Sequence, residues 1–208
     1  MNNTILNGTV SLTDLMRKSI NEKYSLIRYY YTHLFLLSQD NSTNGAFYKP
    51  VFFEFPNLAG AYRAEPSENV MLGPSLKLSI KTTANKNWDS EKNTYFFPAG
   101  KWCDVLHPET ECVFSLGDET EVLPAGLKEY QLHLRDGHII PFQNASALNI
   151  SKSEDLQRYP VDFHINPRNM TRTNRTRLYS ASGLFVNDNG TSTNQEGTYN
   201  KYQVSFSY

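Results

Sequence analysis

The acidic side chains are the first candidates for chemistry in this 208-residue chain. Asp118, Glu119 and Glu121 form the densest acidic cluster, and paired carboxylates are what general acid–base catalysis uses. The cluster lies between Gly117 and Pro124, and polar residues between such turn formers are typical of a solvated loop. We therefore interpret the cluster as a loop rather than as a catalytic pair.

The other titratable side chains are not spaced for a metal site. Asp104 follows Trp102 by two residues, so the two share one face of a strand, and turn capping is the favoured role for the carboxylate. His133 and His138 are five residues apart and would face opposite sides of a strand, so they cannot hold one metal ion together. The sequence has no zinc spacing, no glycine-rich phosphate loop and no Gly-x-Ser-x-Gly motif. We expect no metal and no cofactor.

Charge and hydropathy exclude two further classes of function. The formal net charge of -1 gives no overall field that would attract nucleic acid or an anionic membrane. The longest apolar stretch, Leu26 to Leu37, is interrupted by Arg28 and His33 and is shorter than the roughly 18 residues of a membrane span. Four arginines form the only basic cluster: Arg168, Arg172, Arg175 and Arg177. A polyanion contact is conceivable there, but a solvated loop is favoured.

Eight Asn-X-Ser/Thr sequons are candidate N-glycosylation sites: Asn2, Asn7, Asn41, Asn144, Asn149, Asn169, Asn174 and Asn189. Chance would give roughly three, so the count indicates a glycoprotein of the secretory pathway, lysosomal or extracellular. An asparagine-rich coding bias is the alternative explanation. The N-terminus has neither a basic segment nor an apolar one of the kind that a signal peptide carries, so we expect the chain to be the tail of a longer protein.

The two cysteines are a candidate disulfide. Cys103 and Cys112 flank His107-Pro108-Glu109, a plausible turn, and a bond across such a hairpin would suit an oxidising compartment. Two free buried thiols are the alternative.

Residues 11–38 predict one long helix. Ser11 is followed three residues later by Asp14, which resembles a capping box. Apolar side chains recur at spacings of three and four and should share one face: Met16, Ile20, Tyr24, Ile27, Tyr31 and Leu34. Polar side chains fall mostly on the other face: Lys18, Asn21, Glu22, Ser25 and Arg28.

Most of the chain after Gly45 predicts strands. Val51, Phe53 and Phe55 alternate with Phe52 and Glu54, as in a strand with one apolar face. The same alternation recurs at Leu76, Leu78 and Ile80. A short strand is also expected at 161–166, between two prolines.

Several of these segments resemble glycoside hydrolase family 31, the α-glucosidase family. Residues 45–56 are similar to its G-x-x-x-x-P-(V/L)-F-F-E-F-P junction, where the catalytic barrel ends and a β-sandwich begins. Residues 23–32 are similar to the last barrel helix, and three further segments match later motifs in the family's order: 70–80, 94–104 and 132–141. Leu123-Pro124-Ala125 resembles its L-P-A-P. The sequence departs from the family's pattern at Arg28, Cys103 and Asp136.

The resemblance continues loosely at residues 183–199, which are similar to the passage that opens the family's distal sandwich. It implies a mainly β fold: an N-terminal helix left from a (β/α)8 barrel, an antiparallel β-sandwich and the start of a second β-sandwich. The corresponding domains are 1–44 (barrel helix and linker), 45–143 (proximal sandwich) and 144–208 (partial distal sandwich). Arg28, in place of a proline, should straighten the helix.

The resemblance also implies a function. The family hydrolyses terminal α-linked glucose with two carboxylates about 5 Å apart, in a W-x-D-M-N-E segment and further along the barrel. Neither segment occurs here, so we expect no catalytic residue and an inactive scaffold; residues that bind substrate are unknown. The expected partners are a (β/α)8 catalytic barrel and, in a complete enzyme, carbohydrate. The alternative is a stand-alone β-sandwich module for interaction or carbohydrate binding.

Overall fold

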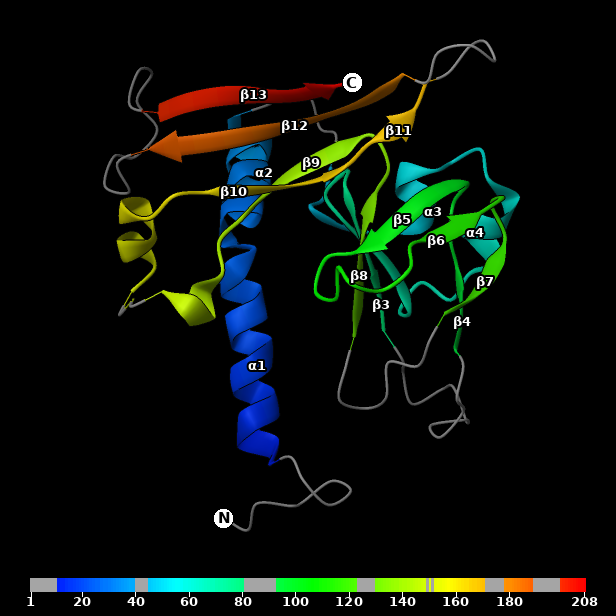
Figure 1. The fold of residues 1–208 in the computed structure, drawn as a ribbon. Coiled ribbons are helices and arrows are strands. Elements are labelled where there is room, and N and C mark those ends of the chain that lie inside the picture. The colour runs from blue at the N-terminus through cyan, green and yellow to red at the C-terminus, as the bar shows by residue number, and fades with distance from the viewer. Residues whose placement is uncertain are drawn as a thin grey trace.

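The computed structural model describes most of the chain, in the following ranges: 11–39, 45–80, 93–122, 130–148, 150, 152–170, 178–188 and 199–208. Within them the protein is mainly β, with two helices at the N-terminal end (Figure 1). The predicted fold class is therefore confirmed.

The predicted N-terminal helix is present, but it is divided into α1 (Leu12–Ser25) and α2 (Ile27–Gln39). The cap is as expected, since the Ser11 side chain accepts a hydrogen bond from the backbone N–H of Asp14. The division at Leu26 follows from Ser25. Its hydroxyl donates to the Asn21 carbonyl, a bond that bends helices, and its carbonyl accepts from the backbone N–H of Gln143 instead of from within the helix. The expectation that Arg28, in place of a proline, would straighten the helix is therefore wrong, because the chain forms two helices here.

The predicted strand at 51–55 is wrong. The strand β1 (Tyr48–Pro50) ends at the proline, and α3 (Val51–Glu54) follows at once, with Phe55 N–H bonding to the Val51 carbonyl. The apolar residues are better described by a helical period, because Val51, Phe52 and Phe55 pack in the core while Phe53 is 64% exposed. A second short helix, α4 (Ala59–Arg63), packs beside α3.

A six-stranded antiparallel sheet forms the centre of the molecule. Its strands are, in spatial order, β1, β2 (Asn69–Leu72), β3 (Leu76–Ser79), β8 (Gln131–Arg135), β5 (Gly100–Asp104) and β6 (Val113–Ser115). Strands β2 and β3 confirm the prediction for 70–80. Side chains alternate between the faces: Val70 and Leu72 point to one apolar cluster, whereas Met71 points to another.

One face of this sheet packs against a second layer. The two-stranded sheet of β4 (Asn93–Phe96) and β7 (Glu119–Val122) covers it together with α3 and α4. The shared cluster is centred on Trp102, which is fully buried and donates its indole N–H to the Pro98 carbonyl at 2.8 Å. Two sheets therefore meet face to face after Pro50, as expected of a sandwich.

The other face of the six-stranded sheet holds α2. Tyr29 is fully buried there; its hydroxyl donates to the Leu72 carbonyl at 2.7 Å and accepts from the Ser75 backbone N–H at 3.3 Å. Leu26, Leu76 and Leu134 pack in the same cluster. The helix is thus attached to the sheet by apolar packing and by the buried Tyr29 hydroxyl, which both donates and accepts a hydrogen bond.

A second sheet lies across the top of the view in Figure 1. It contains β9 (His138–Phe142), β10 (Asp162–Asn166), β11 (Arg168–Asn169), β12 (Tyr179–Asp188) and β13 (Tyr199–Ser207). The two 3-10 helices η1 (Ala145–Ala147) and η2 (Ser153–Arg158) connect β9 to β10. β10 agrees with the strand predicted at 161–166.

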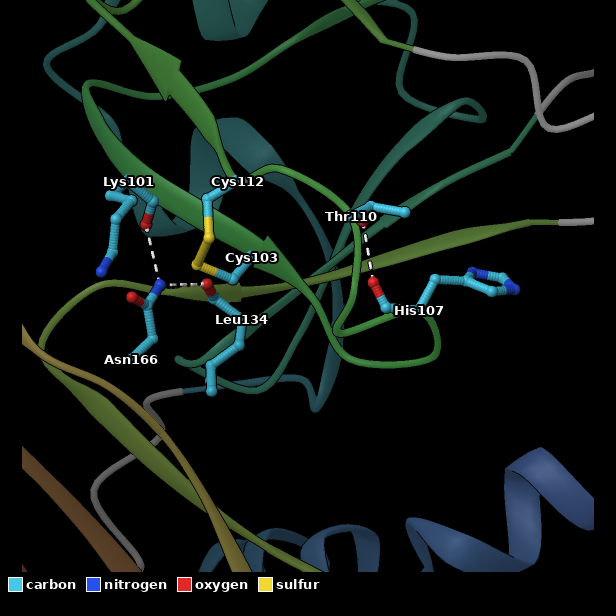
Figure 2. The surroundings of a disulfide bond; sticks show 7 residues. All are labelled: Lys101, Cys103, His107, Thr110, Cys112, Leu134 and Asn166. Atoms are coloured by element: carbon cyan, nitrogen blue, oxygen red, sulfur yellow. Dashed lines mark hydrogen bonds between the residues drawn. A yellow bond between two sulfur atoms is a disulfide. The ribbon is translucent and has the colours of Figure 1, made fainter.

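The two sheets are joined at the turn between β8 and β9. Gly137, at φ 77, allows the tight turn that passes the chain from the first sheet to the second. Asp136 accepts two hydrogen bonds of 3.0 Å from the Arg168 guanidinium of β11. Asn166 of β10 donates from its amide to the carbonyls of Lys101 and Leu134 in the first sheet (Figure 2). The joint is therefore hydrogen-bonded on both sides of the turn.

The disulfide between Cys103 and Cys112 is formed (Figure 2). The antiparallel register of β5 and β6 pairs Trp102 with Val113, which brings the two cysteines opposite each other with their Cα atoms 4.3 Å apart. The loop between them turns at His107, whose carbonyl accepts bonds from Thr110.

Replacing both cysteines by serine is expected to lower the free energy of unfolding by about 2–3 kcal/mol, because the bond closes a short loop and restricts the unfolded chain. Urea unfolding of the oxidised protein and of the double variant measures the difference. An unchanged urea midpoint would show that the loop is held by its other contacts alone.

Candidate functional site

The candidate site is an exposed apolar stripe on α1, which we call the docking face. It consists of side chains at every fourth position: Leu12, Met16, Ile20 and Tyr24, which are 48%, 58%, 51% and 38% exposed. Spacing by four places them on one side of the helix. Figure 1 shows α1 extending downwards, away from the second sheet. The docking face is thus an organised apolar surface that the described chain leaves in solvent.

The prediction for this face was correct only in part. Met16, Ile20, Tyr24 and Leu34 are exposed, as an unpartnered apolar face requires. Ile27 is half-buried, and Tyr31 instead packs against Phe35 and hydrogen-bonds the Asp188 carboxylate of β12. The division at Leu26 changes the orientation of α2 relative to α1, which a single helical pattern does not anticipate.

The polar face predicted opposite the stripe is buried only at its C-terminal end, because Lys18 is exposed and Asn21 and Glu22 are half-buried. Ser25 and Arg28 are buried, at 5% and 8% exposure. Arg28 donates to the side-chain oxygens of Gln143 at 3.0 Å and Asn187 at 3.3 Å. Burial lowers the pKa of Arg28, and Asp188 acts in the opposite direction. Around the division at Leu26 the helices therefore contact the second sheet through hydrogen-bonding side chains, while the apolar stripe of α1 remains exposed.

Two more bonds attach α2 to β12. The Thr32 hydroxyl, fully buried, accepts from the Val186 backbone N–H at 3.0 Å. Tyr31 binds Asp188, and the pKa of Tyr31 rises to about 12 because of burial and of that bond. These contacts fix α2, and therefore the direction of α1 and of the docking face, on the second sheet.

The acidic candidates do not form a catalytic pair. Asp118 is exposed, whereas the side chains of Glu119 and Glu121 on β7 lie outside the description. Asp104 has the predicted turn-capping role: its Oδ1 accepts from the backbone N–H groups of Leu106 at 2.7 Å and His107 at 3.1 Å.

The histidines are on two strands rather than one. His133 lies in β8 beside the Phe97 ring, and His138 in β9 contacts the Ser75 hydroxyl at 3.0 Å. Burial lowers the pKa of His133 to about 3 and that of His138 to about 4, with nearby cations acting in the same direction. Among the residues that the structure describes, no group of three or more His, Cys, Asp or Glu could hold a metal ion.

A buried lysine is the main feature that sequence reasoning missed. Lys77 of β3 has no exposed surface; its amine donates to the Ser79 hydroxyl at 2.6 Å and lies 4.2 Å from the Phe97 ring centre. Burial lowers the pKa of Lys77 to about 7. The signal was present in the sequence, since Lys77 lies between Leu76 and Leu78 in a strand that proves to be covered on both faces.

The remaining candidates are surface residues or fall outside the description. Asn144 and Asn169 are exposed, and Arg168 is paired with Asp136 rather than solvated alone. The following lie in undescribed segments: Asn2, Asn7, Asn41, Asn149, Asn174, Asn189, Arg172, Arg175, Arg177 and the Leu123-Pro124-Ala125 motif. Of the helices in the described ranges, none has the length and hydropathy needed to cross a bilayer.

Comparison with known proteins identifies the central part of the chain. Residues 45–140, from the linker before β1 to the middle of β9, match the family described as the glycosyl hydrolase family 31 C-terminal domain. This match supports a family 31 C-terminal portion in the chain. The predicted resemblance is thereby confirmed.

Two relatives of the chain are named as α-glucosidases. The chain is 27% identical over 141 residues to the α-glucosidase of Hordeum vulgare. The aligned region covers 66% of this chain and 14% of that protein. It is 28% identical over 141 residues to the lysosomal α-glucosidase of Bos taurus, covering 62% of this chain and 14% of that protein. The chain thus spans about a seventh of the length of these relatives.

Solved structures extend the likeness beyond the matched domain. The family 31 dextranase of Flavobacterium johnsoniae, solved in complex with glucose, superposes with a TM-score of 0.67 over 92% of this chain and 21% of its own. The identity is 21%, so this comparison establishes a shared fold. The shared fold includes most of the chain on both sides of residues 45–140.

Proposed function

We propose that this chain is the non-catalytic C-terminal scaffold of a family 31 α-glucosidase-like glycoside hydrolase, inactive by itself. The observation that carries the proposal is the docking face, an exposed apolar stripe on α1 that precedes α2 and the segment matching this family. In the complete protein the reaction would be hydrolysis of terminal α-linked glucose, with both carboxylates supplied by the barrel.

The proposed partner of the docking face is the (β/α)8 catalytic barrel. A fully buried aliphatic side chain contributes about 1.5–3 kcal/mol, so covering four half-exposed ones would contribute about 4 kcal/mol or more. On the opposite side, the hydrogen bonds of Arg28 and Thr32 attach α2 to the second sheet, so the helices would connect the barrel to that sheet. The sandwich would thus support the barrel through two helices.

We further propose a secretory location and a three-part organisation. The Cys103–Cys112 bond and the eight sequons support an oxidising, glycosylating compartment, and one relative is named as lysosomal. The proposed parts are 1–44, 45–143 and 144–208, which are the barrel helix with its linker, the proximal sandwich and a partial distal one. The family match at 45–140 supports the middle part.

The first test uses the chain alone. It should not hydrolyse an aryl α-glucoside, and it should bind a hydrophobic dye or self-associate through the docking face. The double variant Met16→Asp/Ile20→Asp should reduce dye fluorescence several-fold, whereas Leu116→Asp, at a residue that is 93% exposed elsewhere, should not. Hydrolysis by the chain alone would refute the proposed lack of catalysis.

The second test supplies a barrel. In a chimera, residues 11–208 replace the matching segment of the Hordeum vulgare α-glucosidase, and hydrolysis of an aryl α-glucoside is measured. Met16→Asp/Ile20→Asp should lower the yield of active enzyme about tenfold or more, because two unpaired charges would enter a buried interface. Leu116→Asp is the matched control. If both variants lowered the yield of active enzyme equally, the docking face would not be the surface that contacts the barrel.

A further inference from the structure

A groove on the opposite side of α1 from the docking face has the composition of a sugar site. It has a volume of about 510 Å³. Charged side chains of α1, Arg17, Lys18 and Glu22, line one wall, while Val105, Leu106 and Phe142 supply apolar surface. A pyranose presents both kinds of surface, with C–H groups on its faces and hydroxyl groups around its edge, so a groove with apolar and hydrogen-bonding walls suits one or two sugar rings.

A glycosylation sequon lies on the rim of this groove. Asn144 and Ser146 of Asn144-Ala145-Ser146 both line it. The turn is held in place because Gln143 N–H donates to the Ser25 carbonyl of α1 and Ala147 N–H donates to the Asn144 carbonyl. The Ser146 hydroxyl donates to Asn144 Oδ1 at 2.7 Å, which leaves the other end of the amide, Nδ2, as the atom to be glycosylated.

We propose that Asn144 carries an N-linked glycan whose first N-acetylglucosamine lies in this groove against α1. Phe142 and Leu106 would contact the face of the sugar, and Arg17, Lys18 or Glu22 would hydrogen-bond its acetamide and hydroxyl groups. The glycan would occupy the polar side of α1 and leave the docking face open. This modification rests on the secretory location proposed above.

The modification itself needs one co-reactant, a lipid-linked oligosaccharyl diphosphate. Asn144 Nδ2 forms a bond to C1 of the first sugar while the bond from C1 to the phosphate oxygen breaks. The lipid diphosphate leaves, and the amide loses one proton. The product is a neutral glycosyl amide, so the charges of the groove are unchanged.

Asn169 provides an internal comparison. It is also an exposed sequon asparagine, but it lies in β11, paired in register with Tyr179 of β12. It does not line the groove beside α1. A glycan at Asn169 would therefore project from a sheet, whereas a glycan at Asn144 would meet a preformed wall.

The test of occupancy uses the full chain, preceded by a heterologous signal peptide, secreted from a glycosylating eukaryotic host. Peptide mass mapping after enzymatic deglycosylation in ¹⁸O water should find the ¹⁸O label at residue 144. The substitution Ser146→Ala should abolish the label at residue 144 and leave the labels at other sequons unchanged. An unmodified Asn144 would overturn the proposal. The result is independent of the barrel, since the hydrolysis and dye tests use unglycosylated protein.

The test of placement measures how fast an amidase releases the Asn144 glycan from the native protein. Because the first sugar would be packed in the groove, release should be about tenfold slower than from a Lys18→Trp variant, in which the indole fills the groove. Lys23→Trp, on an exposed part of α1 outside the groove, should release as slowly as the unaltered chain. Equal rates for all three would overturn the placement.

Discussion

Replacing Lys77 by methionine is expected to raise the free energy of unfolding at pH 7 by about 2–4 kcal/mol. The amine has no exposed surface, and its pKa is lowered to about 7 from 10.5. Folding at pH 7 therefore requires part of the population to lose a proton that the unfolded chain keeps, and each pKa unit corresponds to about 1.4 kcal/mol. Methionine has similar length and no charge to desolvate.

The surroundings of Lys77 explain why burial outweighs its favourable contacts. The amine has Ser79, the rings of Tyr95 and Phe97, and His133, its cross-strand partner on β8, around it. Ring contacts favour the cation by about 0.5–2 kcal/mol, whereas full burial without a carboxylate partner shifts a pKa by up to about 3–5 units. His133, which burial and the neighbouring Lys77 keep neutral, carries no negative charge that could offset the burial of the ammonium.

The same cause fixes the sign of the pH dependence. Between about pH 7 and 9.5 the unfolded chain binds one more proton than the folded chain at this residue, so stability should rise with pH by about 1.4 kcal/mol per unit at most. Above about pH 10 the rise should stop, because burial raises the pKa of Tyr95 to about 12 and the unfolded phenol ionises first.

Urea unfolding at several pH values between 7 and 9.5 checks both expectations. The Lys77→Met profile should be flatter than that of the unaltered chain. The matched control is Lys201→Met, at an exposed position of β13, which should change stability by less than about 0.5 kcal/mol. A destabilised Lys77→Met protein, or a slope that survives the substitution, would show that the amine is satisfied in its charged form.

The second large effect is expected at Gly183 of β12. A Cβ atom there would lie 2.1 Å from the Ile139 carbonyl oxygen and 2.9 Å from its carbonyl carbon, and both are backbone atoms that no rotamer change can move. Alanine should therefore force β12 away from β9. We expect a loss of about 3 kcal/mol or more, the range of severe overpacking.

The loss should concentrate in the second sheet. β12 and β9 meet in parallel at the pair Ser182 and His138, where the Ser182 N–H donates to the Gly137 carbonyl at 3.0 Å. Limited proteolysis of Gly183→Ala should cleave β12 and β13 before the six-stranded sheet. Ser182→Ala, at the exposed neighbouring position, is the control and should behave as the unaltered chain does. Equal stability of the glycine variant would mean that the strands can separate at little cost.

The sequence predicts those parts of the fold that depend on local pattern. The alternation at Leu76 and Leu78 is present in a strand of the structure, and the predicted cysteine pair is bonded. Residues 51–55 were misread because two neighbouring phenylalanines satisfy both the strand and the helix period, and only packing around Trp102 decides between them. The close contact that requires glycine at position 183 could not be predicted either, because it involves a strand more than 40 residues earlier in the sequence.

The candidate site could be predicted in composition but not in orientation. An amphipathic pattern shows that α1 has an apolar face, and Met16 and Ile20 were assigned to it correctly. The pattern does not show which face this chain covers, because that depends on Gln143 and Asn187, residues far along the chain that accept bonds from Arg28. The burial of Lys77 could not be predicted for the same reason, because the layer that covers its side chain comes from β4, which is distant in sequence.

The turn at Asp136 and Gly137 has a practical consequence for anyone dividing this protein into smaller pieces. β8 and β9 are consecutive, yet they belong to different sheets, and Asn166 spans back to the carbonyls of Lys101 and Leu134. A cut made just after β9 would strip the first fragment of these bonds and leave β9 without neighbours on either edge. The proposed boundary at residue 143 therefore separates two parts that share these hydrogen bonds, and a crystallisable shorter version should retain both sheets.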